Sequence, residues 1–462
     1  MPDMSRLVTQ RDLMRIVSMG KPLARVIESG AYLIKPMLGI SLVKPIVNNI
    51  VSPLVNRSIK TMGINLDIDL KREQDMIIPL ATMAKLLINH YHTIYNSGKN
   101  GRHVAWVNMP TPVELHYAMD VIPCSTEVFA VLESITGMAT RTFEGTESYG
   151  ISRDGCSFDS HLSGAFQVNK LPPGGAFTSF MAPGCDSQGK AFEVGSKITG
   201  VPMHCVNTPF RYNDEDGIEY FKEELMGLIG FLENLTGKEM DYEYLDLVIR
   251  RSNDAISYYR KLFDLRAAKP VPIDALFGGI IPYLPVCDFL GDIQGSTRLL
   301  KGLCVATQKR INKGVGVVDD DALRIHWCQF PPFHDIKLFS DMEKNGAAVV
   351  FEEPAMMWWE LAKGKDPIDA LANKYLACVY NGNTEKRVQK NLEAAKKYKA
   401  DAAIIFMQWG CRQSSANAAA LKDAFNEAGM PALLLDGDCV DARNYASGQV
   451  RTRVEAFIEM LK

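Results

Sequence analysis

The stretch AAIIFMQWGCRQSS, residues 402–415, shows the pattern that decides the fold of this chain. Its apolar start at 402–406 is short and uninterrupted, which predicts a buried β-strand. The residues that follow, SSANAAALKDAFNEAG, predict a helix that ends at Gly429. Cys411 therefore lies where a strand gives way to a helix, a position at which α/β proteins place functional groups. The stretch alone leaves three roles open for Cys411: a nucleophile, a metal ligand or a small buried hydrophobe.

The same alternation of apolar strand and helix recurs on both sides of a long helical region. Residues 103–109, 175–183 and 201–207 predict strands before that region, and a second series runs from 323 to the C-terminus. Strands that alternate with helices predict parallel sheets. We therefore expect an α/β fold with two flavodoxin-like (Rossmann-like) parallel-sheet units, a helical N-terminal extension and a helical insert. The predicted division is 1–98 for the extension, 99–213 for the first α/β domain, 214–315 for the helical segment and 316–462 for the second α/β domain.

The composition is that of a soluble globular protein. Of the 462 residues, 47% are hydrophobic and 23% are charged, and the net charge is −3. This charge argues against a nucleic-acid partner, and the lack of a G-x-x-x-x-G-K-[ST] motif argues against ATP binding through a P-loop. Residues 31–55 are apolar but contain two lysines and three prolines. We therefore expect them to face a partner or lie on a surface rather than span a membrane.

Three of the ten cysteines share one local setting. Cys156, Cys185 and Cys411 each follow a glycine and precede a predicted helix. A glycine lets the backbone approach a bulky group, and a helix start offers free N–H groups and partial positive charge, which lower the pKa of a thiol. No cationic and apolar signal sequence opens the chain, so we expect a cytoplasmic location. In that reducing compartment, cysteines at turns serve as metal ligands or reactive thiols.

The spacing of these cysteines is a weak indicator by itself. They lie far apart in the sequence and no C-x-x-C occurs, so ferredoxin and zinc-ribbon spacings are both absent. The repeated Gly-Cys pattern favours one shared metal site. The alternative is that each thiol is a small buried apolar residue.

Several motifs together resemble one family, the 2-hydroxyacyl-CoA dehydratases and benzoyl-CoA reductases. The likeness covers roughly residues 100–462, and nothing in 1–98 has a counterpart. It is carried by GCSFDSHLSGA at 155–165, MAPGCDSQGKAFEVGSKITGVPMHCVNTPF at 181–210, WGCRQSS at 409–415, PTPVELHYAMDVIP at 110–123 and LLLDGDCVDARNYASGQVRTRVEAFIEML at 433–461.

The resemblance implies a [4Fe-4S] cluster held by Cys156, Cys185 and Cys411 between two α/β domains, with one iron left open for water or substrate. It also implies an acyl-CoA substrate, a related second subunit or a homodimer, and an ATP-hydrolysing iron–sulfur activator that supplies one electron. The expected reaction is the radical dehydration of a 2-hydroxyacyl-CoA to an enoyl-CoA. Two alternatives stay open: an ATP-driven reductase of the same superfamily, acting on an aromatic acyl-CoA or a small molecule, and a non-catalytic electron-relay or scaffold subunit.

Two further residues are candidates for the chemistry. Glu114 lies in the match to the Pro-x-Glu-Leu segment of the family and is our candidate acid or base. The alternative is that its carboxylate complements the dipole of a helix start. His161 follows Cys156 by five residues and could donate a hydrogen bond to cluster or substrate, or it could be a histidine satisfied within its helix.

Additional cysteines depart from the family pattern at positions 124, 205, 378 and 439. The resemblance allows them a role in a larger, bridged double cluster, which occurs in one branch of the superfamily. The alternative is that they are core cysteines. Cys287, Cys304 and Cys328 receive no functional prediction.

Overall fold

Two four-stranded sheets with only parallel neighbours form the framework of the protein. The computed structural model describes residues 74–181, 185–210 and 213–462. The apolar segment 31–55 and most of the predicted N-terminal extension lie outside these residues. The first sheet contains β1 (His103–Val107), β2 (Val121–Ser125), β3 (Ala176–Met181) and β4 (Met203–Asn207), and the second contains β5 (Leu323–Cys328), β6 (Ala347–Glu352), β7 (Ala402–Gln408) and β8 (Ala432–Gly437).

Both sheets have the same topology. The order is β2-β1-β3-β4 in the first sheet and β6-β5-β7-β8 in the second. In each sheet, the second strand in sequence lies on one side of the first strand, and the third and fourth strands lie on the other side. The direction in which strands are added therefore reverses at the first strand. Groups that follow the first and third strands therefore meet at one edge of the sheet, where α/β proteins bind ligands. The predicted fold class is confirmed.

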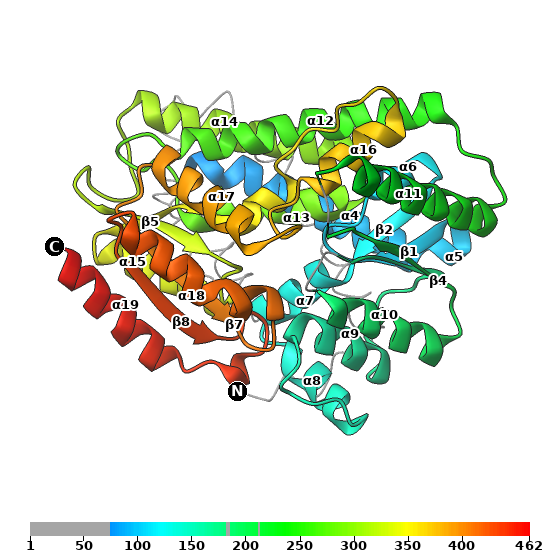
Figure 1. Ribbon diagram of the computed structural model, residues 1–462, viewed down its shortest axis with the longest axis horizontal. Coiled ribbons are helices and arrows are strands. Elements are labelled where there is room, and N and C mark those ends of the chain that lie inside the picture. Colours follow the sequence, from blue (N-terminus) through cyan, green and yellow to red (C-terminus); the bar gives the residue numbers. More distant parts are fainter. Residues whose placement is uncertain (1–73, 182–184, 211–212) are drawn as a thin grey trace, which may run out of the picture.

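Helices cover the sheets and connect them (Figure 1). In the first half they are α6 (Val113–Ala118), α7 (Thr126–Ile135), α8 (Ala139–Ser148), α9 (Ser157–Gln167) and α10 (Asp186–Thr199), after α4 (Ile77–Tyr95) and α5 (Ser97–Asn100). Between the sheets lie α11 (Glu215–Thr236), α12 (Tyr242–Leu265), α13 (Ile281–Asp288) and α14 (Ile293–Asn312). In the second half they are α15 (Lys337–Lys344), α16 (Pro367–Leu376), α17 (Thr384–Lys397), α18 (Arg412–Glu427) and α19 (Ser447–Leu461). Short helices occur at η4 (Gln74–Met76), η5 (Leu276–Ile280), η6 (Phe289–Gly291), η7 (Phe333–Asp335), η8 (Glu353–Trp358) and η9 (Ala442–Asn444).

The strand β2 is the element that the sequence analysis missed. It follows α6 directly, because Asp120 adopts a left-handed backbone with φ 55° and ends that helix after six residues. Pro123 lies inside the strand, where a proline normally argues against sheet pairing. It is tolerated because β2 is at the edge of its sheet and pairs only with β1.

The long helix α12 ties the two halves together. It packs against α14, α6 and α16, and runs across the top of the view above both sheets (Figure 1). Just after it, the fully buried Arg266 donates to both carboxylate oxygens of Glu352 at the end of β6. The strands of each sheet fall inside 99–213 and 316–462, and we keep that division as our proposal for the domains.

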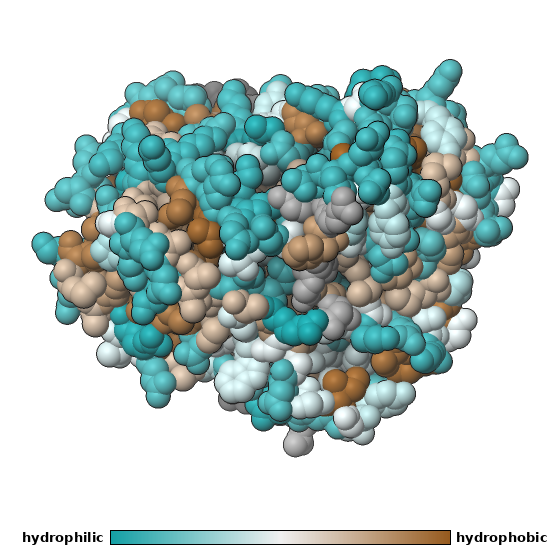
Figure 2. Space-filling view, in the orientation of Figure 1, coloured by the Kyte–Doolittle hydropathy of each residue, from teal (hydrophilic) through white to brown (hydrophobic). Residues whose placement is uncertain are grey.

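The surface on the side shown in Figure 2 is largely hydrophilic, and its apolar patches are small and separate. Among the residues that the structure describes, no helix is both long enough and apolar enough to cross a membrane.

Candidate functional site

The three predicted cysteines occupy equivalent positions at helix starts. Cys156, Cys185 and Cys411 are the N-cap residues of α9, α10 and α18. Each sulfur lies by the first turn of its own helix, where the backbone N–H of Asp159, Gln188 or Ser414 acts to lower its pKa. All three are partly exposed, unlike the buried Cys287 and Cys304. Their partial exposure and their place at helix starts argue against small core hydrophobes, and their role as ligands stays a prediction.

Two of the cysteine loops touch through their backbones although they come from different sheets. Gly410 has φ 69°, a left-handed conformation that favours glycine. A β-carbon at this position would lie 2.7 Å from the carbonyl oxygen of Asp154 and closer still to that of Gly155. Only a residue without a side chain allows this approach, which brings Cys156 and Cys411 to the same place.

The thiols also interact with one another electrostatically. Burial raises the pKa of Cys156 well above its ordinary value, and nearby Asp159, Cys411 and Cys185 raise it further. Burial likewise raises the pKa of Cys185, with Asp159, Cys411 and Glu127 adding to the effect. The three thiols therefore lie near one another and near carboxylates, where a bound positively charged group would favour their deprotonation.

This result corrects one expectation from the sequence. The helix starts were expected to lower the pKa of these thiols, yet the pKa of Cys411 is also raised, because burial outweighs its backbone hydrogen bonds and the nearby Arg387.

A cluster on the three cysteines stays a prediction, and their arrangement can be compared with what a cluster needs. Among the described residues, no three histidine, cysteine or acidic side chains lie close enough to bind one metal ion. In a [4Fe-4S] cluster, each thiolate binds a different iron, so the sulfurs stand further apart. Three neighbouring thiols at three helix starts are compatible with that arrangement.

Hydrogen bonds among Ser157, Gln408 and Asp438, called the latch below, hold the loop of Cys156 against the second half of the protein. The hydroxyl of Ser157 donates to Oδ1 of Asp438 over 2.6 Å and accepts from the amide of Gln408 over 2.9 Å. The same Asp438 oxygen accepts the backbone N–H groups of Val440 and Asp441. The Asp-Gly-Asp motif that ends β8 therefore positions a residue next to a cysteine of the other half.

Glu114 lies in a buried ion pair, and none of its hydrogen bonds involves a cysteine. Its carboxylate accepts from Lys374 over 2.5 Å, from Ser252 over 2.5 Å and from Tyr375 over 2.6 Å. Burial raises the pKa of Glu114, but Lys374 and these hydrogen bonds outweigh burial and hold the pKa below its ordinary value. These contacts join α6, α12 and α16. They favour a positioning role, and the acid–base role stays a prediction.

His161 is buried beside the carboxylate of Glu133, among the helices of the first half of the protein. Its Nε2 lies 3.0 Å from Oε2 of Glu133, and Lys170 lies 3.1 Å from the same carboxylate. Phe129 and Phe143 contact the imidazole edge to face. These contacts engage Nε2, whereas the buried Nδ1 has no hydrogen-bond partner. A role towards cluster or substrate and the alternative of a helix histidine both stay predictions.

The additional cysteines are not gathered at one place among the described residues. Cys439 is near Cys411, which helps to raise its pKa, and its sulfur donates to the backbone carbonyl of Phe330. Cys378 is also near the site, since it and Cys411 both affect the pKa of Tyr380. By contrast, Cys124 interacts with Asp288 and Cys205 with Glu224, away from the three site cysteines. The buried Cys124 suits the core interpretation, whereas Cys205 is partly exposed.

Sequence reasoning missed two residues that adjoin the cysteines. The side-chain amide of Gln329, directly after β5, lies 3.9 Å from the sulfur of Cys411. Glu127, near the start of α7, accepts hydrogen bonds from Gln188 and from the backbone N–H of Met109. Their position directly after parallel strands was the signal that could have revealed both residues. Glu127 was harder to find because it follows β2, a strand that was not predicted.

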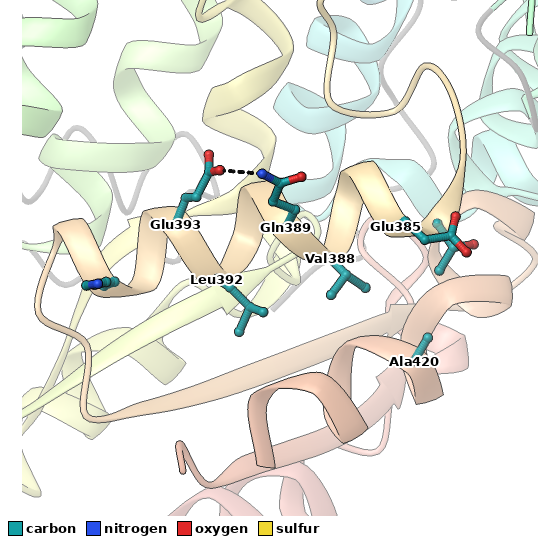
Figure 3. Close-up of a pocket in the computed structure, with 8 residues that line it drawn as sticks. Glu385, Val388, Gln389, Leu392, Glu393 and Ala420 are labelled. Carbon is teal, nitrogen blue, oxygen red and sulfur yellow. Dashed lines mark hydrogen bonds between the residues drawn. The ribbon is translucent and has the colours of Figure 1, made fainter. Parts of the chain in front are cut away.

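One surface groove lies away from this site. It has a volume of about 650 Å³ and runs between α17 and α18 on the outer surface (Figure 3). Val388, Leu392 and Ala420 form its apolar floor, and Gln389 and Glu393 are hydrogen-bonded on one wall over 2.9 Å. Its lining includes none of the three cysteines, so the groove is no part of the candidate site.

Comparison with known proteins now places the chain. The model of the family described as 2-hydroxyglutaryl-CoA dehydratase, D-component (HGD-D), matches residues 108–461. The chain belongs to the HGD-D family. The resemblance inferred from its motifs is thereby confirmed.

Characterised relatives of this HGD-D protein differ in their reactions. A subunit of benzoyl-CoA reductase from Thauera aromatica is 23% identical, with 83% of this chain and 95% of the relative covered. The alpha subunit of (R)-2-hydroxyisocaproyl-CoA dehydratase from Clostridioides difficile is 22% identical over 82% of this chain and 94% of the relative. The beta subunit of (R)-phenyllactyl-CoA dehydratase from Clostridium sporogenes is 33% identical over 60% of this chain and 73% of the relative.

Members of the HGD-D family typically contain iron and sulfur, and several relatives are named as alpha or beta subunits of dehydratases. The matched range includes Cys156, Cys185 and Cys411. Family membership makes this chain a subunit of the dehydratase and reductase type.

Proposed function

We propose that the chain is the iron–sulfur subunit of a 2-hydroxyacyl-CoA dehydratase and holds one [4Fe-4S] cluster on Cys156, Cys185 and Cys411. The observation that carries this proposal is the approach of Gly155 and Gly410, which joins cysteine-bearing helix starts of the two halves. When bound, such a cluster supplies a Lewis-acidic iron with an open position and a reservoir for one electron.

The residues of the chain orient this site and exclude water from it. Ser157 and Asp438 fix the loop of Cys156 against the loop that follows β8. Phe158 packs edge to face against Phe330 and Phe333, with ring centroids 5.8 and 6.3 Å apart. Phe158 and Phe330 adjoin Ser157 and Gln329 in the sequence, so these rings form an apolar wall beside the cysteines. A low dielectric there strengthens every electrostatic interaction with the reacting group.

The proposal includes partners, as the names of the relatives suggest. A related second subunit would complete a heterodimer, a homodimer is the alternative, and an ATP-hydrolysing activator would deliver the electron. The substrate would be the CoA thioester of a 2-hydroxy acid, converted to an enoyl-CoA in a reducing cytoplasm. Four dehydratase alpha subunits and one beta subunit among the relatives support this choice.

A second candidate function is the reduction of an aromatic acyl-CoA. It is favoured by the similarity to the benzoyl-CoA reductase subunit, which covers 95% of that relative. The double-cluster reductase of the superfamily gains less support, because Cys124 and Cys205 lie in separate surroundings. An electron-relay or scaffold subunit is the non-catalytic alternative.

The test is an anaerobic assay of the protein with its partner subunit, reduced activator and ATP. Formation of enoyl-CoA from a panel of 2-hydroxyacyl-CoAs is the expected result. Reduction of benzoyl-CoA without dehydration would support the second candidate instead. A cluster whose spectrum does not change with any acyl-CoA would indicate a relay subunit and contradict both enzymatic proposals.

A further inference from the structure

Gln329 stands out because it combines backbone strain with a position directly beside a cysteine. Its φ is 74°, a left-handed conformation that costs a residue with a side chain about 1 kcal/mol or more. Only 4% of its surface is exposed. Its amide Nε2 lies 3.9 Å from the sulfur of Cys411, within the range of a long N–H···S hydrogen bond. Strain of this kind persists only where the surroundings hold the residue in place.

Several groups hold Gln329 there. The carboxylate of Glu353 accepts its backbone N–H over 2.9 Å. Glu353 is itself fully buried and paired with Arg387, whose side chain also donates to the backbone carbonyl of Gln413, two residues after Cys411. The same ion pair therefore anchors both Gln329 and the start of the helix that Cys411 caps.

The orientation of the Gln329 amide follows from its partners. The backbone N–H of Phe330 points at one end of the amide over 3.2 Å, and this group can only donate. That end must be the carbonyl oxygen, which leaves the NH₂ group facing Cys411. The hydroxyl of Tyr380 donates to the same oxygen over 3.0 Å, and the guanidinium of Arg387 lies over the tyrosine ring. Burial raises the pKa of Tyr380 well above its ordinary value, so it keeps its proton and donates.

We propose that Gln329 is a positioning residue that raises the reduction potential of the cluster, through an N–H···S bond to Cys411 that Tyr380 keeps aligned. This inference rests on the proposed function, because it requires a cluster on Cys411. Accepting an electron increases negative charge on the cluster sulfurs, so a fixed donor stabilises the reduced form. Gln329 would thus set the potential at which the cluster accepts an electron, and it would not contact the substrate.

The test uses the complete, anaerobically loaded protein with four variants. Gln329→Gly removes the amide and suits the left-handed backbone, so it should fold without strain. Gln329→Glu places a carboxylate oxygen where the N–H lay. Tyr380→Phe removes one of two groups that align the amide. The control is Tyr398→Phe, which removes a buried hydroxyl that donates to Asp264 on α12 over 3.2 Å.

Iron content, the EPR signal of the reduced cluster and the midpoint potential from a mediated titration are the readouts. For Gln329→Gly we expect wild-type iron content and a more negative potential, with the reduced-to-oxidised ratio at a fixed potential falling about tenfold, or about 59 mV for one electron. Gln329→Glu should shift it further, Tyr380→Phe less, and Tyr398→Phe not at all.

Each outcome separates the two proposals. Wild-type iron content with an unchanged potential and EPR signal in Gln329→Gly would overturn this inference and leave the proposed cluster intact. Loss of iron in Gln329→Gly would also overturn it, because the residue would then serve binding rather than potential. A wild-type protein without any cluster would overturn the proposed function and this inference with it.

Discussion

The two sheets place similar groups at the same positions, and they differ mainly in one charge. Asn108 follows β1 and Gln329 follows β5, and each donates its amide towards the residues around the cysteine that follows the third strand. Glu127 follows β2 and Glu353 follows β6. Each of these carboxylates accepts a backbone N–H from the residues just after the first strand, over 3.1 and 2.9 Å.

The two sites differ in the side chain that is paired with each carboxylate, Glu353 in the second half and Glu127 in the first. Glu353 is paired with Arg387, which holds its pKa below the ordinary value although burial raises it. Glu127 has the neutral Gln188 in place of a cation, and burial raises its pKa from 4.5 to about 7. A shared topology thus fixes where a carboxylate lies, whereas one nearby cation decides whether it is charged at neutral pH. The first half therefore has a carboxyl group that can exchange a proton beside Cys185.

The largest effect should come from removing the partner of each carboxylate. Arg387→Met leaves a buried charge unpaired and should lower the free energy of unfolding by about 3–5 kcal/mol. The matched change Gln188→Met leaves a carboxyl group that can stay protonated, and should cost only about 1–2 kcal/mol. Urea unfolding at pH 7 measures both. Equal losses would show that the two carboxylates do not differ in charge.

The next effect is the pH dependence that Glu127 should give to stability. Because its pKa is raised in the folded state, the folded protein keeps this proton between pH 4.5 and about 7 while the unfolded chain loses it. Its contribution is therefore fully present below pH 4.5 and is lost as pH rises through 7, by about 3 kcal/mol in total. The amide in Glu127→Gln does not titrate over this range, so the variant lacks this contribution to the pH dependence of stability. The difference in unfolding free energy between wild type and this variant, measured from pH 4.5 to 8, should fall by that amount, and a flat difference would contradict the raised pKa.

A smaller effect should follow from cutting the latch between the halves. Ser157→Ala removes the hydroxyl that joins Gln408 to Asp438 and should cost about 1.5–3 kcal/mol, as expected for a hydrogen bond to a charged group. The bound cluster should also be lost faster in the presence of a chelator. Ser148→Ala, which removes only a bond to the carbonyl of Gly145 within the first half, is the control. Equal effects of the two changes would argue against a latch.

The sequence predicted the sheets well because buried parallel strands are uninterrupted apolar runs. AAIIF before Cys411 and AAVVF at 347–351 show this directly, and both are fully buried in the structure. The strand β2 escaped prediction because Pro123 is acceptable only at a sheet edge, and edges are a property of the assembled sheet. The local sequence does not reveal which strand will lie at the edge of the sheet.

The cysteines were predicted and their surroundings were not. A Gly-Cys pair at a helix start is a local pattern, so Cys156, Cys185 and Cys411 could be found from the sequence. The partners of Glu114 and the closeness of Gln329 to Cys411 depend on contacts between segments far apart in the chain. The raised pKa of the thiols depends in the same way on burial, which the folded protein creates.

The most direct test of the central claim is the iron and sulfide content of anaerobically isolated protein, compared with that of single Cys→Ser variants. We expect about four irons per chain in the wild type. Cys156→Ser, Cys185→Ser and Cys411→Ser should each lose most of that iron. Cys304→Ser is the matched control, since its thiol donates to the carbonyl of Tyr258 in the helical insert, and it should keep the wild-type content. Full iron in any of the three site variants, or equal loss in all four, would contradict a cluster shared by these cysteines.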